Sequence, residues 1–268
     1  MDDRPIGVFD SGLGGLTAVA EIRKILPSEN IIYFGDTSRV PYGGRSRETL
    51  LKYARQDVRF LRSFDIKAIV VACGTVSTNA LTELQAENDL PILGVVEPAC
   101  VRAAKVSRGH IGIIATAASV RSGAYEKRLR ALRPDIRVTA KACPLFVPLV
   151  ENGRYRPGDA VVETVAEEYL APLRQAGVDT LILGCTHYPL LSDVIARTMG
   201  PEVTLINTGA EAAWELKRTL DDRKLDAAPR AGEDRFFASD ISGDFQSIAR
   251  EFLQREIDHV NLVEIDRY

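Results

Sequence analysis

The chain has 268 residues, of which 46% are hydrophobic and 26% charged, and its formal net charge is −3. This composition is typical of a soluble globular protein with a sizeable core, and the length predicts two domains or one elaborated domain. The slightly negative charge excludes the basic surface that is typical of proteins binding nucleic acid or anionic lipid.

The start of the chain, MDDRPIGVFDSG, lacks the basic segment and the long apolar segment of a signal peptide. Apolar runs along the chain are far shorter than the ~20 residues of a membrane-spanning helix. The four cysteines lie far apart and form no CxxC pair. We therefore expect a cytoplasmic protein with reduced thiols and no disulfide framework.

Short apolar runs alternate with amphipathic stretches in the first hundred residues. A strand over 6–9 leads through the loop DSGLGG into a helix over 16–26, and NIIYFGD is a second strand. The loop TSRVPYGGRS precedes a long helix that ends near Phe64, and the strand AIVVA runs into Cys73 and another helix. The segment LPILGVVEP is predicted to be a strand that ends at Pro98. This alternation predicts an α/β fold, with a mostly parallel sheet covered by helices.

The pattern starts again near residue 110. HIGIIATAASV repeats the character of PIGVFDSGLGG, and TLILGCTHYPLL that of AIVVACGTVSTNAL. Cys73 lies 67 residues after Ile6, and Cys185 lies 74 residues after Ile111. Such nearly equal separations predict two similar, pseudo-symmetric α/β domains.

The tail after Asn207 contains a helix around 211–220, the strand RFFASD and a helix bearing Phe245 and Phe252. It is too small for a third domain, so we expect it to pack on the first. The prediction is a discontinuous first domain over 1–97 and 208–268, a second domain over 98–207, and a site in the cleft between them.

Four groups of unusual residues come directly after predicted strands. They are Asp10–Ser11, Pro41–Tyr42–Gly43–Gly44, Cys73–Gly74–Thr75 and Cys185–Thr186–His187. Ligands of parallel sheets bind beyond the carboxyl ends of the strands, so we expect these groups to share one pocket. If the domains face each other, Cys73 and Cys185 approach a ligand from opposite sides.

Two opposed thiols are well suited to inverting a carbon stereocentre. One thiolate removes a proton, and the other thiol returns a proton to the opposite face. We expect the start of a helix after each cysteine to lower the thiol pKa. His187 is placed to tune one thiol, and Asp10 to be the hydrogen-bonding or general-base partner of the other.

Other interpretations of the same residues are less well supported. Cys185 and His187 are possible zinc ligands, but no close spacing supplies further ligands, so no metal is predicted. The loop DSGLGG lacks the third small residue of a dinucleotide loop and carries Asp10 where a pyrophosphate would lie, so no cofactor is predicted. Its main-chain N–H groups suit a small anion such as a carboxylate. We expect packing or surface roles for the remaining candidates, namely Cys100, Cys143, His110, His259, Arg39 and Arg45.

Taken together, the motifs resemble the cofactor-independent aspartate/glutamate racemase superfamily, and within it the enzymes that interconvert L- and D-glutamate. The resemblance rests on six segments in the order and spacing of the family: IGVFDSGLGGLTAV, YFGDTSRVPYGGRS, VVACGTVS, IGIIAT, CPLFVPLVENG and LILGCTHYPLL. It implies two α/β domains, a homodimer, and a supply of D-glutamate for bacterial peptidoglycan.

The resemblance also implies roles for particular residues. Cys73 and Cys185 would be the catalytic thiols, assisted by Asp10, Glu151 and His187. The implied substrate contacts are Asp10, Ser11, Pro41, Tyr42, Gly43, Gly74, Thr75, Thr116, Thr186 and His187.

The chain departs from the family at Gly74, because the family usually has Cys-Asn-Thr around the first thiol. The missing carboxamide removes one substrate hydrogen bond, while the Gly74 N–H remains. Two alternatives stay open on the residues alone. They are a racemase of aspartate or another acidic amino acid, and a non-catalytic protein that binds acidic metabolites.

Overall fold

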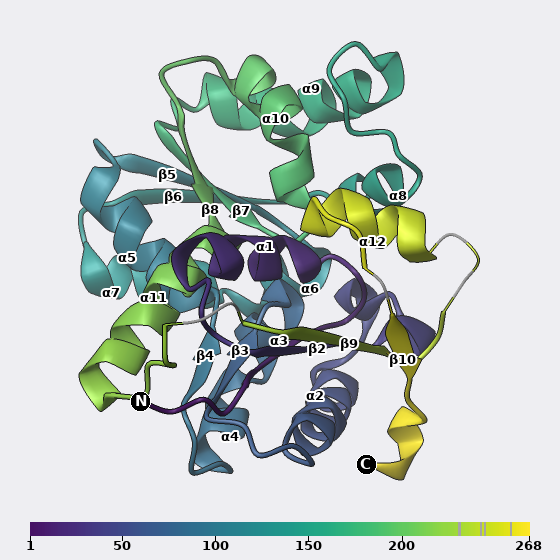
Figure 1. The fold of residues 1–268 in the computed structure, drawn as a ribbon. Coiled ribbons are helices and arrows are strands. Elements are labelled where there is room, and N and C mark those ends of the chain that lie inside the picture. Colours follow the sequence, from purple (N-terminus) through teal and green to yellow (C-terminus); the bar gives the residue numbers. More distant parts are fainter. Residues whose placement is uncertain (230–231, 242, 244, 258) are drawn as a thin grey trace.

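The computed structural model describes residues 1–229, 232–241, 243, 245–257 and 259–268, which form two parallel sheets covered by helices (Figure 1). In the described residues the first sheet has the strand order β10-β9-β2-β1-β3-β4, and the second has the order β6-β5-β7-β8. The strands of the first sheet are β1 (Ile6–Asp10), β2 (Ile31–Gly35), β3 (Ala68–Val71), β4 (Ile92–Gly94), β9 (Asp234–Ala238) and β10 (Val260–Leu262). Those of the second are β5 (His110–Ala115), β6 (Arg137–Ala142), β7 (Thr180–Gly184) and β8 (Thr204–Asn207).

Both sheets are parallel throughout the described residues. The order β2-β1-β3-β4 matches β6-β5-β7-β8 when each is counted along the chain. Cys73 follows β3 and Cys185 follows β7, so the two cysteines come after equivalent strands. The predicted α/β fold class with two parallel, helix-covered sheets is therefore confirmed.

The two sheets draw on separate parts of the chain. Strands of the second sheet all lie within 98–207, and described strands of the first all lie outside it. Strand β9 of the tail pairs with β2, which places the tail in the first sheet. The domain boundaries themselves stay a prediction.

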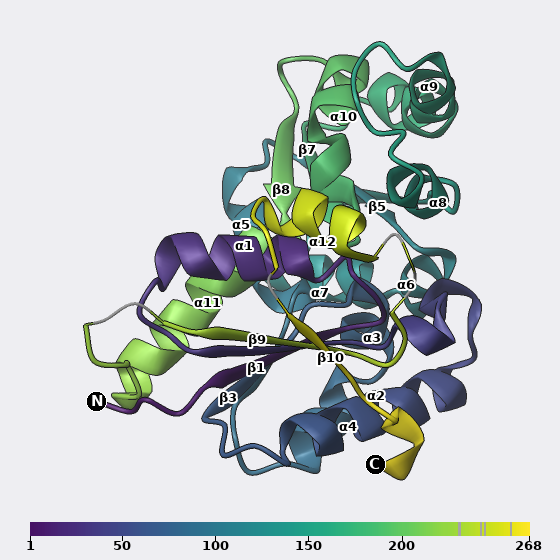
Figure 2. The same cartoon turned by 45° about the vertical axis from the view of Figure 1, so that its right-hand side comes forward.

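Helices cover both faces of each sheet. Figure 2 shows α1 and α11 on one face of the first sheet and α2 and α4 on the other. The described helices are α1 (Leu16–Ile25), α2 (Arg47–Leu61), α3 (Gly74–Asn79), α4 (Leu81–Ala86), α5 (Val96–Val106), α6 (Ala117–Ser122), α7 (Ala124–Leu132), α8 (Phe146–Glu151), α9 (Ala160–Gln175), α10 (Ser192–Met199), α11 (Thr208–Arg223) and α12 (Phe245–Leu253). Single 3-10 turns occupy Thr37–Arg39, Tyr42–Gly44, Tyr188–Leu191 and Ile265–Arg267.

Three local predictions need correction. The strand expected to reach Pro98 ends at Gly94, and Pro98 lies in the first turn of α5. Proline is tolerated there because its missing N–H has no partner within the helix. The single helix expected after Cys73 is divided into α3 and α4 at Ala80. The tail also contains β10, a short edge strand without a clear apolar pattern.

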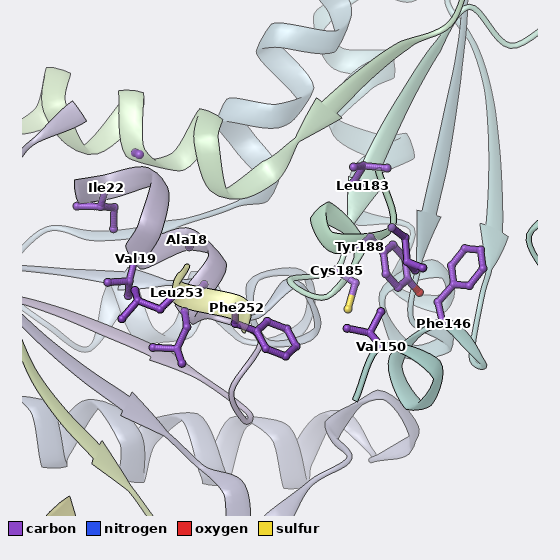
Figure 3. Close-up of a cluster of buried hydrophobic side chains, with 14 of the residues drawn as sticks. Ala18, Val19, Ile22, Phe146, Val150, Leu183, Cys185, Tyr188, Phe252 and Leu253 are labelled. Carbon is purple, nitrogen blue, oxygen red and sulfur yellow. The ribbon is translucent and has the colours of Figure 1, made fainter. Parts of the chain in front are cut away.

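One buried cluster of apolar side chains connects the two sheets. Figure 3 shows Val19 of α1 and Phe252 of α12 on one side of it, and Cys185, Tyr188 and Phe146 on the other. These side chains are almost completely buried. Because protein interiors are close-packed, the side chains around Cys185, which come from both halves of the fold, hold it in place.

Candidate active site

A cavity of about 450 Å³ opens where the carboxyl ends of the two sheets meet. Its lining comes from the loops after β1, β2 and β3 of the first sheet and after β5, β6 and β7 of the second. All predicted site residues except Asp10 line it: Ser11, Pro41, Tyr42, Gly43, Cys73, Gly74, Thr75, Thr116, Glu151, Cys185, Thr186 and His187. Asp10 lies immediately behind this lining and is 1% exposed.

Cys73 forms part of the wall contributed by the first sheet. It occupies the position directly before α3 without a capping hydrogen bond from its side chain, and its Sγ lies 3.6 Å from the Ser11 Oγ. Burial and the charge of Asp10 raise the pKa of the Cys73 thiol above its ordinary value. The expectation of a lowered pKa is therefore wrong for Cys73. The helix that follows is only six residues long, and main-chain donors near the sulfur do not outweigh burial.

The Asp10 carboxyl is poised to exchange a proton with Cys73. Its Oδ2 accepts the Gly15 N–H at 2.9 Å, while Oδ1 is buried without a hydrogen-bond partner among the described residues. Burial raises the pKa of Asp10 above its ordinary value, and the charge of His187 and the Gly15 N–H offset this rise only in part. A carboxylate with one unpaired oxygen beside a thiol is a good proton acceptor.

Cys185 has the opposite electrostatic surroundings. Its Sγ lies 3.8 Å from Nδ1 of His187, whose Nε2 lies 3.0 Å from Oε1 of Glu151. Burial lowers the pKa of His187, but its contacts with Cys185 and Glu151 outweigh burial and raise that pKa to about 10. At neutral pH the imidazole is therefore charged, so that one nitrogen donates toward the sulfur and the other toward the carboxylate.

His187 is also held from two further directions. The centres of the Phe252 and His187 rings lie 5.1 Å apart, with the ring planes at an angle of 83°. On another side lies Gly14, where a Cβ atom would be 2.6 Å from Nδ1 of His187. The hydroxyl of Thr17 donates to the Thr186 carbonyl at 2.9 Å. The start of α1 thus fixes the Cys185–His187 loop, and Gly14 is needed for this close approach.

Hydroxyl groups bridge the two sheets along one side of the cavity. The Oγ1 atoms of Thr75 and Thr116 lie 2.9 Å apart, and Thr116 also caps α6 by accepting the Ser119 N–H. Gly43 packs against Thr116, since a Cβ atom there would be 3.1 Å from the Thr116 Cβ. These groups offer hydrogen bonds to a polar ligand between the sheets.

The segment over 143–148 supplies an apolar wall that the sequence reasoning did not predict. Cys143, Pro144, Val147 and Pro148 line the cavity, so the expectation that Cys143 only packs is incomplete. Gly12, Val40, Gly44, Ala117 and Gly184 complete the lining. The segment has few polar residues to signal a site, although it follows a strand end as the predicted groups do. Cys100 is buried outside the lining, 3.8 Å from the Tyr125 carbonyl.

Within the ranges that the structure describes, no cluster of three or more His, Cys, Asp or Glu side chains is arranged to hold a metal ion. No helix in those same ranges combines the length and the apolar character needed to span a bilayer.

Comparison with known proteins identifies the class. Residues 17–216 match the family described as Asp/Glu/Hydantoin racemase. The chain is 44% identical over 268 residues to a glutamate racemase of Geobacter metallireducens, covering 99% of this chain and 98% of the relative. A crystal structure of glutamate racemase from Francisella tularensis with D-glutamate has 39% identity, covers 100% of both chains and superposes with a TM-score of 0.94. Glutamate racemase RacE1 from Bacillus anthracis covers 98% of both chains, with 40% identity and a TM-score of 0.93.

The fold and the comparisons together define a racemase, and therefore an isomerase, as the motifs predicted. The chain belongs to the Asp/Glu/Hydantoin racemase family, and the similar proteins described above are glutamate racemases.

Proposed function

We propose that this chain interconverts L- and D-glutamate by proton transfer between two cysteines. The observation that carries the proposal is the placement of Cys73 and Cys185. They follow equivalent strands of two similar sheets and line one cavity, one cysteine from each sheet. The relatives at 39–44% identity that are named glutamate racemases support glutamate as the substrate.

The reaction needs one thiolate and one thiol. The thiolate takes the proton from Cα, the electron pair moves toward the substrate carboxylate, and the thiol delivers its proton to the opposite face. Each cycle leaves the enzyme with the roles of the two sulfurs exchanged, and the reverse reaction uses that form. No atom is lost or gained, because one proton enters and one leaves the substrate.

The two thiols have different charged neighbours. The imidazole of His187, whose pKa is raised, lies beside Cys185, whereas Asp10 and burial keep the proton on Cys73. When Cys73 must act as the base, Asp10 is the group that accepts its proton. In the same way, His187 returns a proton to Cys185, and Glu151 holds His187 in place.

Substrate contacts follow from the lining. We propose that the carboxylates and the ammonium group of glutamate bind the hydroxyls of Ser11, Thr75, Thr116 and Thr186, together with main-chain groups of Pro41–Gly43 and Gly74. The apolar wall over 143–148 then packs against the methylene groups of the substrate and keeps water from the Cα carbanion.

The decisive experiment uses the purified chain in D₂O without added cofactor. It is incubated separately with L-glutamate and L-aspartate, while loss of the α-proton and of optical rotation is followed. Exchange with glutamate supports the proposal, exchange with aspartate alone transfers it to the other acidic amino acid, and no exchange favours a binding protein. Cys73→Ser and Cys185→Ser should each abolish racemisation with the fold retained. Near-normal turnover in either would exclude the two-thiol mechanism.

Three broader points remain proposals. A role in peptidoglycan synthesis requires that the gene for this chain support growth of a bacterium that needs external D-glutamate. A homodimer requires twice the monomer mass in sedimentation. A cytoplasmic location requires that cell fractionation recover the chain with cytoplasmic markers.

A further inference from the structure

Tyr42 is one of the residues that line the cavity, but its hydroxyl group points away from the cavity. The hydroxyl contacts Oδ2 of Asp36 and lies 3.4 Å from Oδ2 of Asp57, in a buried group behind the cavity wall. Both carboxylates are fully buried. The segment over 41–44 therefore lines the cavity mainly with main-chain atoms, since Gly43 and Gly44 have no side chains.

Asp36 is the centre of this buried group. Its Oδ2 accepts Nε of Arg39 at 2.6 Å, and its Oδ1 accepts the hydroxyl of Ser239 at 2.8 Å. With the Tyr42 hydroxyl, Asp36 receives three donors, one of them charged. Bonds of this kind are among the stronger and more directional ones in proteins.

Arg39 ties the same group to α2. Its Nη1 donates to Gln56 at 2.6 Å and its Nη2 to Asp57 at 3.2 Å, while the guanidinium stacks on the Tyr53 ring at 4.2 Å. The side chain of Arg39 is only 12% exposed, so its predicted place on the solvated surface is wrong. The arginine faces two buried carboxylates, and its cost of burial is offset only in that arrangement.

These contacts connect the segment over 41–44 to the ends of two strands of the first sheet and to the helix α2. Asp36 follows β2, Ser239 follows β9, and Gln56 and Asp57 belong to α2. The Tyr42 ring also packs on the Tyr53 ring, with centroids 5.5 Å apart, while Gly43 and Gly44 have no side chains that could fix the segment over 41–44. On its other side, Gly43 touches Thr116 of the second sheet.

We propose that Asp36 and Arg39 are positioning residues for substrate binding, which act by holding Tyr42 so that the main chain of 41–44 keeps its place at the cavity. The inference rests on the proposed function for its kinetic part. Neither Asp36 nor Arg39 lines the cavity, so their effect is on the binding surface and not on proton transfer.

The test compares two buried carboxylates of the same sheet. Asp36→Asn keeps the shape but weakens the hold on Tyr42 and Arg39. Asp234→Asn is the matched control, because the Asp234 side chain is only 2% exposed and pairs with Arg23, but Asp234 begins β9, at the end opposite to Ser239. Glutamate racemisation is measured for both variants, together with amide hydrogen exchange of the ligand-free proteins.

For Asp36→Asn we expect a KM for glutamate about tenfold higher, with kcat nearly unchanged. We also expect faster exchange of the Arg45 amide, which is bonded to the Tyr42 carbonyl at 3.0 Å. Asp234→Asn should alter neither quantity. An unchanged KM, or a loss confined to kcat, would overturn the positioning role even if exchange increases.

Two further results keep the test decisive. If Asp36→Asn does not fold, Arg39→Lys takes its place, because lysine keeps the charge but cannot hold Asp36, Asp57 and Gln56 at once. If the unaltered chain does not racemise glutamate, the proposed function fails. The rate of hydrogen exchange at the Arg45 amide then still decides whether Asp36 holds the segment over 41–44 in place.

Discussion

Gly74 gives the sharpest test of what sets the spacing of the two thiols. A Cβ atom at this position would lie 2.4 Å from the Gly184 carbonyl oxygen and 3.3 Å from its carbon, while ordinary contact begins at 3.4 Å. Gly74→Ala therefore fits only if the two segments separate by about 1 Å. The obstacle is main chain, so rotating a side chain does not relieve it.

This separation acts directly on the reacting groups, because Gly74 follows Cys73 and Gly184 precedes Cys185. A displacement of about 1 Å can lower a rate about 100-fold. The effect on stability is smaller, since overpacking costs about 1–3 kcal/mol and alanine gains up to about 1 kcal/mol over glycine within a helix. Gly74→Ala should thus lose far more activity than stability.

The assay is racemisation of each glutamate enantiomer followed by circular dichroism, with thermal unfolding of the same samples. Gly94→Ala is the matched control. Its Cβ atom would also lie 2.4 Å from a neighbour, but that neighbour is Cδ2 of Leu81, the far end of a side chain that can rotate. Gly94 does not line the cavity. The control should lose some stability and keep kcat/KM within about twofold.

For the Gly74→Asn variant, the family resemblance and the contact with Gly184 predict opposite changes in activity. The family resemblance alone predicts a gain, because a carboxamide adds a substrate hydrogen bond. The contact with Gly184 predicts a greater loss than for alanine, because asparagine has the same Cβ and further atoms. A Gly74→Asn chain that is more active than the unaltered one, or a fully active Gly74→Ala, would refute the steric reasoning.

Three other predictions concern the groups around the thiols. The pKa of His187 is raised from 6.5 to about 10, so its contribution to stability is full below pH 6.5 and is lost as the pH rises to about 10. Denaturant unfolding between these values should show that fall in the unaltered chain and a smaller one in His187→Asn. Asp10→Asn should lower kcat about 100-fold or more and lower the pKa of Cys73, measured as faster alkylation of Cys73 by iodoacetamide. Phe252→Leu should reduce kcat/KM more than Phe245→Leu on the same helix, because only Phe252 has a ring contact with His187 among the described residues.

Each of these predictions can fail clearly. An identical pH dependence in His187→Asn would mean that the imidazole is not charged by its surroundings. Slower or unchanged alkylation in Asp10→Asn would show that Asp10 does not raise the pKa of Cys73. Equal losses of kcat/KM in the two phenylalanine variants, with equal losses of stability, would show that Phe252 contributes only to packing and does not position His187.

The sequence predicts the strand ends well because buried parallel strands are continuous apolar runs. A polar residue after such a run, as at Cys73 or Cys185, marks the place where the chain leaves the sheet. Other features have no such mark. The edge strand β10 lacks an apolar run, and the apolar wall over 143–148 lacks polar residues. The direction of the Tyr42 side chain depends on Asp36, whose other carboxylate oxygen binds Ser239, 203 residues further along the chain.

The electrostatics of the site depend even more on the fold. The repeat in the sequence predicts two equivalent thiols, and the strand order agrees with that symmetry. Yet Asp10 lies beside Cys73 and His187 beside Cys185, so equivalent strand ends carry opposite charges. Enantiomers have equal free energies, so the proposed reaction has an equilibrium constant of one and kcat/KM must be the same in both directions. The asymmetry can therefore appear only in kcat and KM separately, and a symmetric fold can hold an enzyme that binds and releases its two enantiomers differently.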